Sequence, residues 1–151
     1  MNRILYRTAA LSALLIAAAC SGEKKESEEH QAEKSAPTVS GAGASDVKPT
    51  GRNIVVELYT DEKGNYFKPA KFEVHRGDKI TFTLMSGVHN VHFLPDSNAG
   101  KQGLPAPSEF LQLPGQTYEL IVSLASGKYF FQCDPHALLG MVGHLEVEDE
   151  E

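Results

Sequence analysis

The sequence predicts an all-β domain, an antiparallel sandwich or barrel of Greek-key type, beginning near Asn53. Three observations support this prediction. Short β-like segments recur from this residue onward, clusters of Pro, Gly, Asn and Ser separate them, and none has the apolar periodicity of an amphipathic helix. About eight short strands within roughly a hundred residues are typical of two packed sheets or of a closed barrel.

Three strand patterns are expected in the first half of this region. The first covers 54–59, and the second, over 72–74, follows Pro69. Residues 75–78 form a turn into the third, over 79–84. There Ile80, Phe82 and Leu84 alternate with polar residues, which is the pattern of a strand buried on one face.

The second half of the region contains five more expected strands, over 89–94, 109–113, 117–123, 128–133 and 142–147. Residues 95–108 are rich in Gly, Pro and Ala, so we expect a long connection there with room for a helical turn. The strand over 128–133 ends at Asp134-Pro135, because proline restricts the residue before it and cannot donate to a strand ladder.

The N-terminal residues 1–19 are expected to be a signal peptide rather than part of the fold. Arg3 and Arg7 give a basic start, and the apolar run over 9–19 is too short to span a bilayer. The run ends in Ala17-Ala18-Ala19-Cys20, which resembles a bacterial lipobox with Cys20 as the lipidated residue. The alternative is ordinary cleavage after Ala-x-Ala. Lipidation predicts a protein anchored at the bacterial envelope and facing the periplasm.

The segment 20–50 is expected to be a flexible tether between this anchor and a domain over 51–151. Its first part is almost entirely charged and its second part is small and polar, so it has little to bury in a core. The whole chain has a net charge of −6, and loss of Arg3 and Arg7 with the signal peptide leaves −8. An acidic chain is unsuited to nucleic acid. It suits a basic redox partner, although acidity also simply favours solubility.

The chemistry of the chain is concentrated in the motif Cys133-x2-His136-x4-Met141. A thiolate, an imidazole and a thioether are the donor set that suits copper, whereas calcium and magnesium prefer oxygen. If Cys20 carries lipid, Cys133 has no disulfide partner, and a free thiol in an oxidising compartment is a liability unless a ligand is bound to it. A bound metal ion would be that ligand; the alternative is a buried, inert cysteine.

A second histidine is needed to complete a plane of one cysteine and two histidines. In an extended segment His89 shares a face with Val91 and Phe93, whereas His92 points the other way with Asn90. The apolar pair indicates the core face, so His89 is the expected ligand and His92 faces solvent or a neighbouring strand. The other histidines lie in the tether, beside a turn or on a strand surface: His30, His75 and His144.

These motifs resemble the plastocyanins, within the cupredoxin family of blue copper proteins. The resemblance covers about 53–147 and rests on His89-Asn90-Val91, on residues 129–133, on Pro135-His136 and on residues 140–143. It implies a Greek-key β-sandwich in which His89, Cys133 and His136 bind one copper ion in a plane, with Met141 as the axial ligand.

The resemblance also implies a role for two neighbours of the ligands. Asn90 matches a residue that ties the two ligand loops together. Asp134 stands where plastocyanins commonly have serine, and its charge near copper is expected to lower the reduction potential. Val88 replaces a usual proline. The photosynthetic partner of plastocyanin is not carried over.

The expected function is one-electron transfer through Cu(I) and Cu(II), without catalysis, and the resemblance implies a small monomer. Redox partners are expected to dock near His136 and the apolar pair Leu138 and Leu139, although loop packing also explains that pair. Two alternatives are weighed. A multicopper enzyme is disfavoured because the sequence has no His-x-His pair, and a copper store or chaperone is disfavoured because it has only three methionines.

Overall fold

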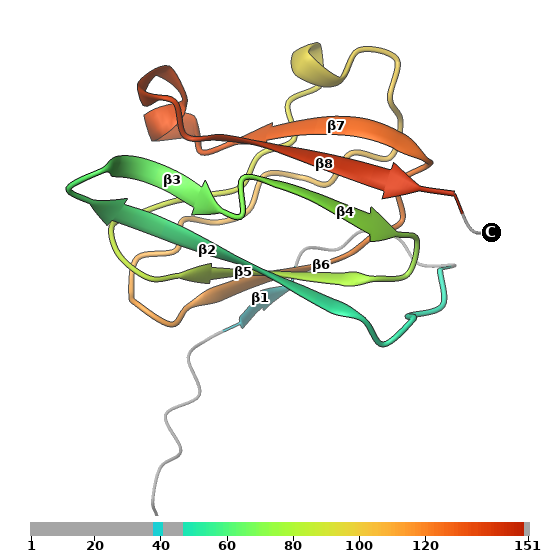
Figure 1. Ribbon diagram of the computed structural model, residues 1–151, viewed down its shortest axis with the longest axis horizontal. Coiled ribbons are helices and arrows are strands. Elements are labelled where there is room, and N and C mark those ends of the chain that lie inside the picture. The colour runs from blue at the N-terminus through green and yellow to red at the C-terminus, as the bar shows by residue number, and fades with distance from the viewer. Residues whose placement is uncertain (1–37, 41–46, 150–151) are drawn as a thin grey trace, which may run out of the picture. The chain divides into compact units, whose positions relative to one another are not determined.

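Two β-sheets packed face to face make up the domain in the computed structural model, which describes residues 38–40 and 47–149 (Figure 1). The five-stranded sheet has the order β1 (Thr38–Ser40), β6 (Thr117–Ile121), β5 (Lys79–Leu84), β2 (Asn53–Asp61), β3 (Gly64–Lys68). The three-stranded sheet has the order β4 (Lys71–His75), β8 (Val142–Glu148), β7 (Gly127–Gln132). The predicted all-β sandwich is confirmed.

Strand pairing within the two sheets is mixed. The pairs β2–β3, β5–β6 and β7–β8 are antiparallel, whereas β2–β5, β4–β8 and β1–β6 are parallel. The parallel pairs join strands that are not consecutive in the sequence; between β2 and β5, for example, the chain crosses to the other sheet to form β4 and then returns. The hydrophobic pattern shows which residues face the core, but it does not show which strands become neighbours.

The core lies between the sheets and is built from the inward faces of the strands. Ile80, Phe82 and Leu84 are fully buried, as their alternation predicted. Phe131 of β7 stands at the centre, with its ring 4.9 Å from that of Phe67 and 5.7 Å from that of Phe82. Such rigid aromatic packing fixes the end of β7, where the chain continues into Cys133.

The region between β5 and β6 differs from the prediction. The expected strands over 89–94 and 109–113 form isolated bridges only, from His89 to Leu111 and from His92 to Gln132. A short 3-10 helix, η1 (Asp96–Asn98), provides the helical turn expected in the long connection. The bridge from His92 to Gln132 places the segment around His89 against the end of β7, so the fold brings together the two parts of the chain that carry the copper motif.

Two strands were not expected from the sequence. β3 pairs with the end of β2 across a tight turn at Glu62 and Lys63. Its two aromatic residues stand between Gly64-Asn65 and Lys68-Pro69, so its strand pattern is too short to recognise in the sequence. β1 lies inside the segment predicted to be a tether and pairs with β6. The predicted signal peptide and Cys20 lie outside the described residues. Among residues 38–40 and 47–149, no helix is long and apolar enough to cross a membrane.

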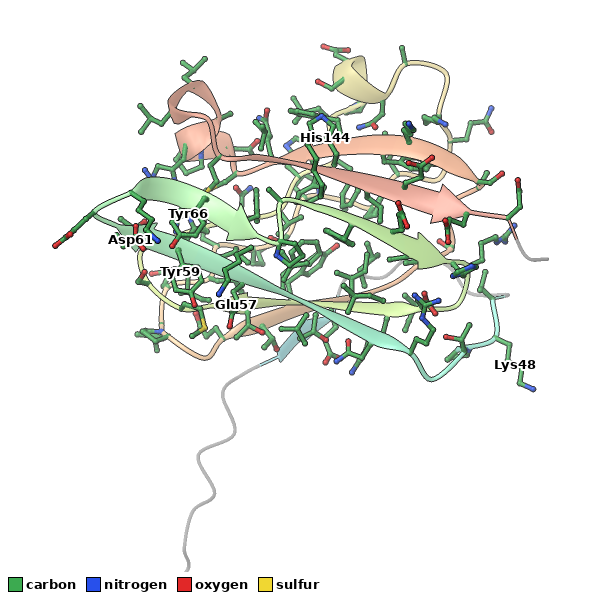
Figure 2. All side chains as sticks on the ribbon, viewed as in Figure 1. Lys48, Glu57, Tyr59, Asp61, Tyr66 and His144 are labelled. Carbon is green, nitrogen blue, oxygen red and sulfur yellow. The ribbon has the colours of Figure 1, made fainter. Side chains whose placement is uncertain are left out.

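The β2–β3 hairpin carries a stacked tyrosine pair on the outer face of its sheet, as the labelled side chains of Figure 2 show. The rings of Tyr59 and Tyr66 lie 5.2 Å apart. Tyr66 donates a 2.7 Å hydrogen bond to Asp61, and this bond, more than partial burial, raises the pKa of Tyr66 to about 12. The pair closes the hairpin directly beside Thr60, a residue that contacts the candidate site.

Candidate metal centre

Three side chains from two distant parts of the chain converge at one end of the sandwich. The Nδ1 atoms of His89 and His136 lie 3.1 Å apart. The Sγ atom of Cys133 lies 3.6 Å from the first and 3.3 Å from the second. His89 and Cys133 are buried, whereas His136 is partly exposed. Within the described residues, this is the one cluster of His, Cys, Asp or Glu side chains that meets the spacing of a metal site.

The triangle of donor atoms has the size that a first-row metal ion requires. Its edges of 3.1, 3.3 and 3.6 Å place its centre about 1.9 Å from each corner, close to the roughly 2.0–2.3 Å of nitrogen and thiolate bonds to a first-row ion such as zinc. Two imidazoles and one thiolate in a triangle are the planar set of blue copper sites, completed by a weak thioether. The residues therefore fit copper.

His89 is held in the tautomer that a ligand needs. Its Nε2 lies 3.0 Å from the carbonyl oxygen of Ser86 and 3.1 Å from Oγ1 of Thr60. A carbonyl only accepts, so Nε2 carries the proton and the lone pair of Nδ1 faces the site. Burial, with a smaller effect of His136, lowers the pKa of His89, which keeps the ring neutral and available to a metal.

Cys133 sits at the end of β7 with its side chain fully buried. Burial raises the pKa of this thiol, and the nearby Asp134 charge adds to the effect, while hydrogen bonds involving Asn90 and His136 oppose it. A metal ion that bound here would displace the thiol proton, since the thiolate is the ligand. Within residues 38–40 and 47–149, Cys133 is a free cysteine.

His136 and Met141 belong to a tightly wound return loop. Residues Asp134–Leu139 form the 3-10 helix η2, which begins where the sequence predicted the end of the preceding strand. The N–H of Met141 donates to the carbonyl of His136, and the N–H of Cys133 donates to the carbonyl of Met141, both at 3.1 Å. Met141 is fully buried. The three motif residues are therefore joined through the backbone as well as through their place in the sequence.

Asn90 and Asp134 join the two ligand-bearing parts of the chain. The Asn90 side-chain amide donates to Oδ2 of Asp134, and the Asp134 N–H donates to Oδ1 of Asn90, both at 2.8 Å. Asn90 follows His89, and Asp134 follows Cys133. The tie that the resemblance implied for Asn90 is thus formed with the residue that departs from the usual plastocyanin pattern.

Three residues near the site had no functional role in the sequence analysis. Thr60 and Ser86 hold His89, and no sequence signal connects them with a histidine on another segment. His92 points away from the metal ligands, as predicted, and its Nδ1 lies 3.0 and 3.1 Å from the two carboxylate oxygens of Asp134. In an extended segment His92 and Asn90 face the same side, because they are two residues apart. That pattern could have indicated that both side chains contact the same residue, which is Asp134.

The remaining described histidines lie elsewhere. His144 is exposed on β8 (Figure 2), with its ring 5.7 Å from that of Phe130. His75 is partly exposed and lies 2.7 Å from an Arg52 nitrogen and 3.4 Å from a Glu148 oxygen. Neither contributes to the metal cluster. His30 lies outside the described residues.

Substitution of Gly87 tests whether the support of His89 governs metal binding. Gly87 has a φ of +87°, and a Cβ there would lie 2.8 Å from Nε2 of His89 and would overlap Thr60. We expect Gly87→Ala to displace the imidazole and to lower copper affinity by about 10- to 100-fold. Competition titration with a copper chelator measures this change.

Gly100→Ala is the matched control for Gly87→Ala. Gly100 also has a left-handed φ, of +77°, but a Cβ there meets nothing within 4 Å. Both variants suffer backbone strain of roughly 1–2 kcal/mol, and only the first disturbs His89. Equal copper affinities in the two variants would show that contact with His89 does not matter.

Comparison with known proteins assigns the domain to a family. A family model described as copper binding proteins, plastocyanin/azurin family, matches residues 54–148. The chain is 39% identical to the plastocyanin of Solanum crispum over 100 residues, which are 62% of this chain and 99% of that protein. It is 40% identical to plastocyanin A/B of Petroselinum crispum over 98 residues, covering 61% and 97% of the two chains.

A solved structure agrees with these sequence relatives. The oxidized form of plastocyanin from Dryopteris crassirhizoma superposes with a TM-score of 0.52 at 34% identity, covering 62% of this chain and 99% of that one. Plastocyanin-like cupredoxins carry electrons and are not enzymes. The donor triangle, the buried methionine and the family match agree, and the chain belongs to the plastocyanin/azurin family as a type 1 copper electron-transfer protein.

Proposed function

We propose that this protein carries single electrons between redox proteins at the bacterial envelope, without catalysis, as a lipid-anchored monomer. Its partners dock on the apolar surface around His136. The observation that carries this proposal is that one copper ligand, His136, is partly exposed beside apolar residues, whereas His89 and Cys133 are buried. Electrons therefore have a short route to a partner through one ligand.

Copper, when bound here, supplies a one-electron couple between Cu(I) and Cu(II). The chain itself holds the donor atoms in place. His89 is fixed by Ser86 and Thr60, and the Cys133 and Met141 backbones are hydrogen-bonded to each other. Donors that move little between two oxidation states keep the barrier to electron transfer low.

The surface around His136 is apolar and hollowed. A shallow cavity of about 770 Å³ is lined by both His136 and apolar side chains, including Val88, Phe110, Pro135 and Leu139. Leu138 is completely exposed and Leu139 is 70% exposed. Exposed apolar side chains gathered around one point are typical of an interaction site. We call this surface the apolar rim.

The copper assignment is tested first by Cys133→Ser. The intense visible band of a blue copper protein arises from the cysteine thiolate bound to Cu(II), so we expect this variant to lose the band completely. Visible absorption and electron paramagnetic resonance of the copper-loaded chain measure the effect. The variant Cys20→Ser, which leaves Cys133 in place, is the control and should stay blue. A Cys133→Ser protein that kept the band would contradict the assignment.

The role of the apolar rim is tested by Leu139→Lys. When two copies exchange an electron through their apolar rims, the new lysines face each other and the apolar contact is lost. We therefore expect the rate of electron self-exchange between the Cu(I) and Cu(II) forms to fall about tenfold. Nuclear magnetic resonance line broadening in mixtures of the two forms measures the rate. Val55→Lys is the control, because Val55 is an exposed apolar residue too but does not line the cavity. Equal self-exchange rates in the two variants would show that electrons do not pass through the apolar rim.

The envelope location rests on the sequence Ala17-Ala18-Ala19-Cys20 and on the signal-peptide character of residues 1–19. In a bacterial host we expect the wild-type chain in the membrane fraction and Cys20→Ser in the soluble periplasmic fraction. Ser21→Ala, which alters the next residue and leaves the thiol, should stay with the membrane. Recovery of Cys20→Ser with the membrane would show that lipid on Cys20 is not the anchor.

A further inference from the structure

Asp134 places a carboxylate directly beside the copper motif, and three side chains converge on it. Oδ2 accepts from the Asn90 amide at 2.8 Å, and Oδ1 accepts from the Gln132 amide at 3.0 Å. The Nδ1 of His92 lies 3.0 and 3.1 Å from the two oxygens. The side chain of Asp134 is 39% exposed. The carboxylate is thus partly solvated and partly neutralised by donors of this chain.

Both oxygens of Asp134 act as hydrogen-bond acceptors, since Oδ2 accepts from the Asn90 amide and Oδ1 accepts from the Gln132 amide. This is the arrangement of a carboxylate that only accepts, so Nδ1 of His92, which lies 3.0 and 3.1 Å from the two oxygens, meets them as a donor. His92 is therefore a donor to the group that follows Cys133 in the chain.

The backbone holds His92 in this position. His92 N–H donates to the carbonyl of Gln132, and Gln132 N–H donates to the carbonyl of His92, both at 2.9 Å. This bridge fixes His92 opposite the last residue of β7. Its side chain is only 23% exposed, so the ring lies against the carboxylate rather than in solvent. The contact is built into the strand pairing that also positions Cys133.

A negative charge next to a metal stabilises the more positive oxidation state and lowers the reduction potential. A donor that withdraws charge from the carboxylate weakens this effect. Asn90 already has a separate role, because it also accepts the Asp134 N–H. His92 is bonded through its ring to the carboxylate, so its contribution is electrostatic.

We propose that His92 is a positioning residue for the copper centre, which holds the Asp134 carboxylate, draws charge from it and so raises the reduction potential. This inference rests on the proposed electron-carrier function and names how that function is tuned. The residue acts through Asp134 and does not contact the metal.

The experiment is a redox titration of the copper-loaded full chain and its variants. In His92→Phe the carboxylate loses a donor, and we expect the reduction equilibrium to shift two- to fivefold toward Cu(II), which is about 20–40 mV at 59 mV per tenfold for one electron. His92→Gln keeps a side-chain N–H and should recover at least half of this loss. Asp134→Asn should raise the potential and abolish the effect of His92→Phe in the double variant.

Two further measurements separate the possible failures. The visible band of each variant reports whether the copper centre has formed, and thermal unfolding of each metal-free variant reports whether the domain has folded. His75→Gln, which alters a histidine bonded to Arg52, is the control and should leave the potential unchanged. The inference about His92 would be overturned if the His92→Phe protein were blue and had the wild-type potential. It would also be overturned if His92→Phe shifted the potential equally in the wild-type and Asp134→Asn backgrounds. Either result would leave the electron-carrier function intact.

A His92→Phe protein that lost the blue band would also overturn the inference, because His92 would then be structural. A wild-type protein without the blue band would overturn the electron-carrier function itself.

Discussion

Two hydrogen bonds between Asn90 and Asp134 are the constraint on which the rest of the centre depends. His89 and Cys133 are 44 residues apart, and these bonds, both 2.8 Å long, join the residue after each ligand. Asn90 is buried, so leaving its amide without a partner would cost about 1–3 kcal/mol. That penalty disfavours separation of the two ligand segments and keeps the donor triangle closed.

The triangle brings two imidazoles and a buried thiol together, with the Nδ1 atoms and the sulfur 3.1–3.6 Å apart. Burial, with a smaller effect of His136, lowers the pKa of His89. These polar groups stay in place only if the surrounding chain is rigid. The aromatic cluster around Phe131, two residues before Cys133, supplies this rigidity, because rings at 4.9–5.7 Å allow little movement of β7. The packing of the core therefore also limits the movement of the metal ligands.

The sequence predicted what depends on local pattern. The Cys133–His136–Met141 spacing indicated the donors, and strand parity chose His89 over His92, since Val91 and Phe93 mark the core face and are buried. It did not predict the parallel pairing of β2 with β5, because pairing depends on where the chain crosses between the sheets. The contact of Thr60 with His89 was equally hidden, since it spans 29 residues and joins two different segments.

The burial of the ligands has a consequence for how such a carrier works. His89, Cys133 and Met141 are buried, and of the four ligands only His136 lines the apolar rim. If both partners dock on the rim, as proposed, the donor and the acceptor use the same surface in turn, and each complex dissociates before the next forms. Such a contact would be small and apolar rather than extensive, which suits the shallow hollow beside His136. A domain on the proposed Cys20 tether, with a reach of about 20–30 Å, would meet this requirement by turning one face between two partners.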